Sequence, residues 1–343
     1  MMRRTKSKLC ALLCGAFLIG CSTSDNVADT DTTVESGPTD AQSSVSESES
    51  AFSLESSASE SESAFPEETT GAQSSKTGVL DYALAHDFIS VMYDGDEDYE
   101  HMAYTGGNQS WFYNDQTGEG YYTLQEQGCG LMAVADTLIY MSLHHENLAG
   151  LTDVRPDENG VIDYETYSDY ILGMYAMDDV FVFDEMFGGI MGITLDDAVR
   201  KCASMRDCSL TASWNKPDKD APERFTIDDA KYFLEDCGLE EDDLEDFTKR
   251  TNTIISMLEN DIPVPMSIGP GRYVNFRQDD LEFPVTTHYY IVGGMHLDYD
   301  NKTITLDIYS WGKNYTVDYL EHTLAVYPDA SSFSSYILIK NRG

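Results

Sequence analysis

The sequence has few basic residues. Its 343 residues include 21 Lys and Arg against 61 Asp and Glu, which gives a formal net charge of −40. Nucleic-acid binding relies on clustered Lys and Arg, so this balance argues against nucleic acid as a partner. The sequence also lacks a Gly-rich phosphate loop, an HExxH motif, a GxSxG motif and a zinc-type CxxC pair, which removes the usual signatures of several enzyme classes.

Apolar residues are present in sufficient number for at least one sizeable core. They make up 41% of the chain, with 22 Tyr, 14 Phe and 3 Trp. This composition excludes disorder throughout the chain.

The N-terminus predicts export. Basic residues open the chain, and the apolar run from Leu9 to Ile19 has the length of a signal-peptide core but is too short to span a membrane. The run ends in Leu-Ile-Gly-Cys21, which resembles the lipobox of bacterial lipoproteins. We expect a signal peptide at 1–20, lipidation of Cys21 and anchoring to the cell membrane, on its extracytoplasmic face, through lipid alone. An ordinary secretory signal with an incidental Cys is the alternative.

Residues 21–76 predict a disordered stalk. They are rich in Ser, Thr and Glu, and the heptad Ser-Glu-Ser-Glu-Ser-Ala-Phe occurs at 46–52 and again at 59–65. Such a segment buries too little apolar surface to offset its chain entropy. We therefore expect one folded domain at 77–343, whose acidic surface would steer cationic peptides toward it.

Cys129 stands out among the four cysteines of that domain. It lies between Gly128 and Gly130, and apolar residues at helical spacing follow as far as Ser142. The pattern predicts a helix whose first turn begins at Cys129. A helix N-terminus lowers a thiol pKa, and the thiolate is the reactive form. The alternative is a buried cysteine at the start of a core helix. Of the others, Cys202 and Cys208 are close enough to bridge, and Cys237 is predicted to be a buried small side chain.

Gly128-Cys129-Gly130 and the small-residue helix after it resemble the nucleophile helix of papain-like cysteine peptidases. The bacteriocin-leader (double-glycine) peptidase branch and its exported relatives are the most similar. This superfamily requires a Cys, then a His, then an orienting polar residue. His288 opens a predicted strand as His-Tyr, and Ser-Trp-Gly at 310–312 is similar to the segment after the orienting Asn of papain. Taken alone, His288 could also be a surface histidine at a strand end.

The resemblance covers about 120–143 and 250–343. It implies an α+β, papain-like fold in which the nucleophile helix packs on an antiparallel sheet formed largely by 263–340. A large insert at about 144–250 has no counterpart. Strands are predicted over 285–297, 303–309 and 315–319.

The resemblance also implies roles for individual residues. Cys129 would be the nucleophile and His288 the general base and later acid, as a thiolate–imidazolium pair. Asp307 is chemically the best group to orient the imidazole, and Ser310 is the rival by position. The family's oxyanion-binding Gln lies about six residues before the cysteine, where this sequence has Thr, so Gln125 is the nearest candidate.

The implied activity is hydrolysis of peptide bonds, or transfer of the acyl group to an amine, without a metal or an organic cofactor. The substrate would be a peptide or protein, cationic or neutral. A non-catalytic surface lipoprotein that binds a peptide or a cell-wall component is the main alternative, because the oxyanion and orienting positions depart from the family pattern. An amidase acting on peptidoglycan cross-links is a further one.

Overall fold

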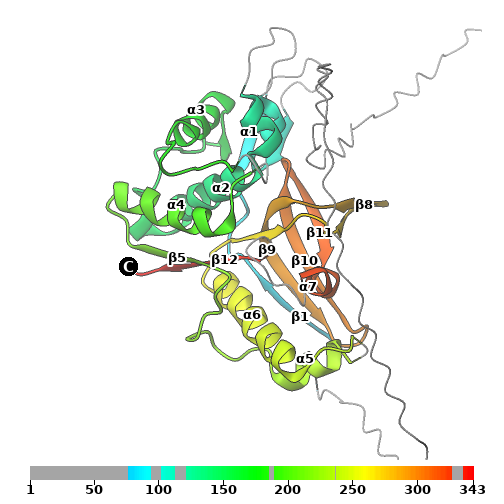
Figure 1. Ribbon diagram of the computed structural model, residues 1–343. Coiled ribbons are helices and arrows are strands. Elements are labelled where there is room, and N and C mark those ends of the chain that lie inside the picture. The colour runs from blue at the N-terminus through cyan, green and yellow to red at the C-terminus, as the bar shows by residue number, and fades with distance from the viewer. Residues whose placement is uncertain (1–75, 94–101, 113–120, 185–188, 236, 327–334) are drawn as a thin grey trace, which may run out of the picture. The chain divides into compact units, whose positions relative to one another are not determined.

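The computed structural model describes the predicted domain at 77–343 with gaps. The predicted signal peptide, Cys21 and all but the last residue of the predicted stalk lie outside the described residues. The fold is mixed α+β and its sheets are antiparallel, as predicted, apart from one parallel pairing (Figure 1). The described ranges are 76–93, 102–112, 121–184, 189–235, 237–326 and 335–343.

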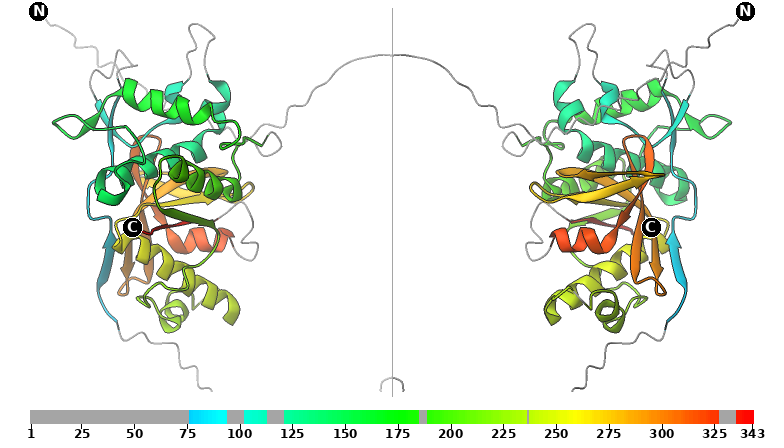
Figure 2. Two further views of the ribbon diagram at one scale, coloured as in Figure 1. Left: turned by 90° about the vertical axis from the view of Figure 1, so that its left-hand side faces the viewer. Right: turned by 90° about the vertical axis from the view of Figure 1, so that its right-hand side faces the viewer.

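A seven-stranded sheet is built around β9 (His288–Asp298). One edge of β9 pairs with β6 (Val264–Ile268) along its first half and with β1 (Val79–Ala83) along its second half. The other edge pairs with β10 (Thr303–Ser310), with a shift of register at Asp307. The sheet order is β1-β9-β10-β11-β7-β8, and β1 runs along one edge of the sheet (Figure 2).

The hairpins that follow His288 agree with the sequence pattern. β9, β10 and β11 (Lys313–Asp318) match the three predicted strands, and a two-residue turn joins β10 to β11. The sheet lies within the predicted 263–340 except for β1, which the sequence did not predict. The remaining strands of the sheet are β7 (Val274–Gln278) and β8 (Leu281–Val285).

Helix α2 (Cys129–His144) is the core helix of the domain. Every residue from Gly130 to Ser142 is buried. This explains why small and apolar side chains occur on all sides of the helix and not along one stripe. Adjacent strand residues point to opposite faces of a sheet. Tyr289 packs against α2, whereas Tyr290 lies edge-on to His322 of α7 (Tyr319–Val326), so these two helices cover opposite faces of the sheet.

The predicted insert is built into the domain. It contributes α3 (Tyr164–Tyr175) and α4 (Gly192–Met205), which both contact α2. Its strand β5 (Leu210–Trp214) pairs with the C-terminal strand β12 (Ile337–Asn341). The other elements are α1 (Tyr122–Gln127), α5 (Ile227–Phe233), α6 (Glu241–Glu259), the small sheet of β2 (Ser90–Tyr93), β3 (Met102–Thr105) and β4 (Val161–Ile162), and the 3-10 turns η1 (Gln109–Phe112) and η2 (Glu146–Leu148).

Candidate active site

Cys129 is the first residue of α2, as predicted, and its two glycine neighbours lie in tightly packed surroundings. Helix α1 runs up to Gly128, where a Cβ would lie 2.1 Å from the backbone oxygen of Leu124. A Cβ on Gly130 would lie 2.9 Å from Leu195. The two glycines therefore allow the chain to pass from one helix into the next and leave the half-buried Cys129 side chain at the junction.

His288 is the first residue of β9, and its imidazole is buried. The Trp311 ring stacks on it at a centroid distance of 4.2 Å. Trp311 and Gly312 form the turn between β10 and β11, and both have positive φ, +50° and +74°, as a two-residue turn of this hairpin type needs. The turn holds the indole over the imidazole.

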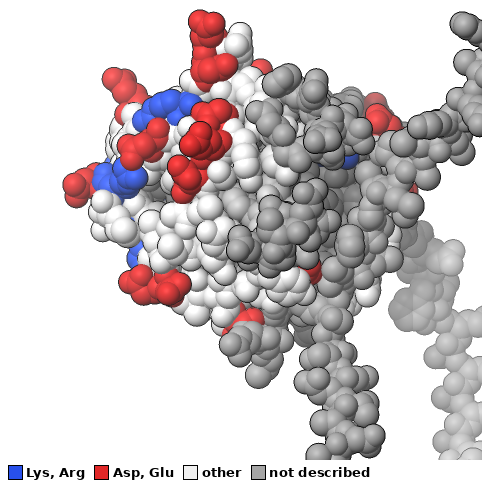
Figure 3. Space-filling view, turned by 90° about the horizontal axis from the view of Figure 1, so that it is seen from above, with Lys and Arg blue, Asp and Glu red and all other residues white. Residues whose placement is uncertain are grey.

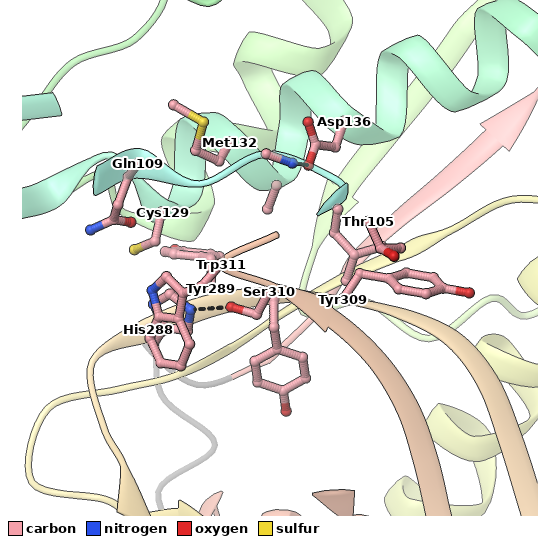
Figure 4. Close-up of a pocket in the computed structure, with 14 residues that line it drawn as sticks. Thr105, Gln109, Cys129, Met132, Asp136, His288, Tyr289, Tyr309, Ser310 and Trp311 are labelled. Atoms are coloured by element: carbon pink, nitrogen blue, oxygen red, sulfur yellow. Dashed lines mark hydrogen bonds between the residues drawn. The ribbon is translucent and has the colours of Figure 1, made fainter. Parts of the chain in front are cut away.

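Cys129 and His288 line the same pocket, an open hollow whose empty space of about 320 Å³ includes solvent outside the protein. The sulfur of Cys129 points toward the imidazole (Figure 4). Nε2 of His288 lies 2.7 Å from Oγ of Ser310, and Nδ1 has no hydrogen-bond partner among the described residues. Nδ1 is thus the ring nitrogen that can exchange a proton with the thiol.

The prediction that Asp307 orients this imidazole is wrong. Asp307 pairs across the sheet with Gly294, six residues along β9 from His288, which is about 20 Å of extended strand. Its carboxylate contacts Nε2 of His296 at 2.8 Å. Because side chains alternate along a strand, Asp307 and Ser310 point to opposite faces of the sheet. The contact to His288 is made by Ser310, the rival by position.

The prediction for Gln125 is also not supported by the geometry. Gln125 is not among the residues that line the pocket, whereas Gln109 is (Figure 4). Gln109 is in η1, and its Nε2 donates a hydrogen bond of 2.7 Å to the backbone oxygen of Gln125. The side-chain amide next to Cys129 therefore comes from a residue far outside the spacing typical of the family, and no local motif in the sequence marks it.

Burial dominates the electrostatics of the pocket. It lowers the pKa of His288 to about 3, because the charged imidazolium would lose its hydration. Ser310 offers a hydroxyl, which carries no charge to offset this loss. The imidazole is therefore neutral at pH 7.

The other thiols of the domain differ from Cys129 in their setting. Cys202 and Cys208 form no disulfide. Cys202 is buried in α4, and burial raises the pKa of its thiol to about 11, which makes it unreactive at neutral pH. Cys129 is the cysteine that lines the pocket.

No family model, curated protein or solved structure matches this chain. Among the described residues, no helix is long and apolar enough to cross a membrane. The same residues contain no group of three or more His, Cys, Asp and Glu side chains able to hold a metal ion.

Proposed function

We propose that this protein is a papain-like cysteine enzyme, attached to the cell surface as a lipoprotein, that hydrolyses peptide bonds or transfers their acyl group to an amine. The observation that carries the proposal is the meeting of Cys129 and His288, from distant parts of the chain, in one pocket. The order Cys129, His288 and Ser310 and the packing of a nucleophile helix on an antiparallel sheet also support it.

The mechanism begins with the sulfur of Cys129. Its attack on a carbonyl carbon forms the S–C bond while the thiol proton moves to Nδ1 of His288. This requires the tautomer in which Nε2 carries hydrogen and donates it to Ser310. The Gln109 amide and the backbone N–H of Cys129 bind the oxyanion of the tetrahedral intermediate.

The acyl-enzyme then forms and is hydrolysed. The C–N bond breaks as Nδ1 of His288 returns its proton to the leaving amine. His288 then takes a proton from water as the water oxygen attacks the thioester, the C–S bond breaks, and Nδ1 returns the proton to the sulfur of Cys129 as the acid is released. An amine can attack in place of water. Since the resting imidazole is neutral, His288 acts as a general base during attack, and the thiolate–imidazolium pair is a minor species before substrate binds.

The surface charge is consistent with a cationic or neutral peptide substrate. On the α3 and α4 side of the face shown in Figure 3, Asp and Glu side chains outnumber Lys and Arg. Such a surface attracts cationic segments and repels anionic ones.

The test is alkylation of the protein by iodoacetamide across pH, followed by mass spectrometry of the labelled site. We expect labelling of Cys129 at neutral pH, abolished in Cys129→Ser and slowed at least tenfold in His288→Ala, since a positioned base contributes about 10²–10⁴-fold. Cys208→Ser serves as the matched control, because it removes a half-buried thiol outside the pocket.

A second candidate function is binding without catalysis. Two properties of His288 favour it: its hydrogen-bond partner Ser310 is uncharged, and its pKa is low. A Cys129 that is alkylated as fast in His288→Ala as in the wild-type protein would exclude the enzyme and favour this candidate.

A further inference from the structure

The segment from Thr105 to Gln109 carries the Gln109 amide into the pocket. At its start, the backbone N–H of Thr105 donates to the backbone oxygen of Gly312 at 2.9 Å. Near its end, Nδ2 of Asn108 donates to the backbone oxygen of Trp311 at 3.2 Å. The segment is thereby attached to the turn that covers His288.

Its middle is attached to Asp136, a buried residue of α2 about two helical turns beyond Cys129. The backbone N–H of Gly107 donates to Oδ2 of Asp136 at 2.8 Å. The hydroxyl of Tyr167, from α3, donates to Oδ1 at 2.6 Å. Each carboxylate oxygen thus accepts one hydrogen bond, and Asp136 also lines the pocket.

At Gly106 and Gly107 the backbone lies too close to Asp136 and Tyr167 to leave room for a side chain. A Cβ on Gly107 would lie 1.7 Å from the hydroxyl of Tyr167. A Cβ on Gly106, which has φ +75°, would lie 2.8 Å from Oδ2 of Asp136. The two glycines allow the backbone to reach the carboxylate.

An ionised carboxylate at position 136 costs free energy because it is buried. Burial raises the pKa of Asp136 to about 6, and the hydrogen bonds from Gly107 and Tyr167 offset only part of this effect. Among the described residues, the titratable groups that interact with Asp136 are the phenols of Tyr167 and Tyr170, and no basic residue does so. An uncharged acceptor could hold one of the two donors without this cost, whereas an ionised carboxylate holds both.

We propose that Asp136 is a positioning residue, which holds the Thr105–Gln109 segment so that the Gln109 amide faces the oxyanion formed at Cys129. This inference rests on the proposed function. Asp136 acts through Gln109 and takes no part in proton transfer between Cys129 and His288.

The experiment compares two reactions of Cys129 in the full chain. Acylation by p-nitrophenyl acetate passes through an oxyanion, whereas alkylation by iodoacetamide does not. We expect Gln109→Ala to slow acylation by about 10²-fold, the usual effect of losing one oxyanion donor, and to leave alkylation within about twofold. Asp136→Asn should slow acylation by roughly tenfold, also without affecting alkylation.

The double variant tests whether Asp136 acts through Gln109. Residues that act as a unit are not additive, so Gln109→Ala with Asp136→Asn should acylate no more slowly than Gln109→Ala alone. An acylation rate in the double variant that is reduced by the product of the two single effects would overturn the inference. So would a fall in the alkylation rate as large as the fall in the acylation rate. If Gln109→Ala leaves acylation unchanged, the oxyanion assignment of the proposed function fails, and the inference about Asp136 fails with it.

A readout independent of chemistry completes the test. Hydrogen exchange of the peptide covering 103–112 should speed up in Asp136→Asn, while that of α2 should not. Tyr167→Phe removes one of the two hydrogen bonds to Asp136 and should give a smaller change in the same direction, which also covers the case of a variant that fails to fold. Unchanged exchange in both variants would overturn the inference.

Discussion

Ser310→Asp should turn the neutral pair of Cys129 and His288 toward an ion pair. The substitution puts a carboxylate where a hydroxyl now contacts Nε2 of His288 at 2.7 Å. A negative charge in contact with an imidazolium stabilises the charged form and raises the pKa of the imidazole. The reactive thiolate of Cys129 should become more populated at low pH.

The size of the effect follows from the pocket. An ordinary thiol has a pKa of about 8.5, and the pKa of His288 is about 3. Moving the proton from one to the other therefore costs roughly 7 kcal/mol. Two opposite charges in contact return about 4 kcal/mol at an effective dielectric constant of about 20. The remaining difference leaves the ion pair at about 1% or less, and a carboxylate that raises the pKa of His288 by about 1 to 3 increases this share at least tenfold.

The assay is the rate of Cys129 alkylation at pH 5.5 and pH 9.5. We expect a rise of about tenfold or more at the lower pH and little change at the higher pH, where the thiol ionises without help. Ser310→Asn is the matched control, because it has the same shape without the charge, and should show no rise. Equal alkylation rates for the Asp and Asn variants at pH 5.5 would refute the reasoning. So would a wild-type alkylation rate that is the same at pH 4 as at pH 9.5.

Three further changes test how the domain is built. Burial lowers the pKa of His322 to about 4. Only the unfolded chain therefore takes up the proton as pH falls from 6.5 to 4, and the free energy of unfolding falls by about 3 kcal/mol over that range. Urea unfolding of His322→Gln at pH 7 and pH 4 should lack this part of the loss, and the same pH dependence in the variant and the wild-type protein would contradict the assignment. Gly107→Ala should lower the free energy of unfolding by about 2 kcal/mol through overpacking, whereas Gly173→Ala, with open space around its Cβ, should raise it by about 0.5–1 kcal/mol; similar values for both would show that space is not the cause. Trp311→Asn creates the favoured Asn-Gly turn but uncovers His288, whose pKa in an NMR titration should rise from about 3 toward about 6.5; a value still near 3 would assign the burial to other residues.

Much of the site's framework could be predicted from local patterns. Apolar spacing and two flanking glycines were enough to begin a helix at Cys129, and a run of aromatic and β-branched residues was enough to begin a strand at His288. Both signals depend on neighbours within a few residues, so they survive without knowledge of the tertiary structure.

The third residue could not be predicted because it depends on register. Asp307 and Ser310 are both near the end of β10, and Asp307 is the better chemical partner for an imidazole. Which of them reaches His288 depends on the pairing of β10 with β9, and that pairing shifts at Asp307. A change of one residue in register moves a side chain to the other face of a sheet, and the only local sign of this shift is the glycine pair Gly293-Gly294 at the irregularity.

Gln109 was missed for a different reason. A donor six residues before the cysteine can be sought by counting, but Gln109 reaches the pocket from a separate 3-10 turn. Its position depends on hydrogen bonds to the β10–β11 turn and to Asp136, which are far apart in the sequence. Contacts of this kind exist only once the chain has folded.

Backbone strain gives an independent reason to regard the pocket as functional. Among the residues that the structure describes, seven non-glycine residues have positive φ, and four of these are Asp or Asn, which tolerate this conformation. Thr287 and Trp311 are two of the other three, and they adjoin His288 in sequence and in space. A β-branched Thr and a Trp are costly there, at about 1 kcal/mol or more each, and glycine would remove that cost. A base that is held and shielded from water, the role proposed for His288, would account for this cost.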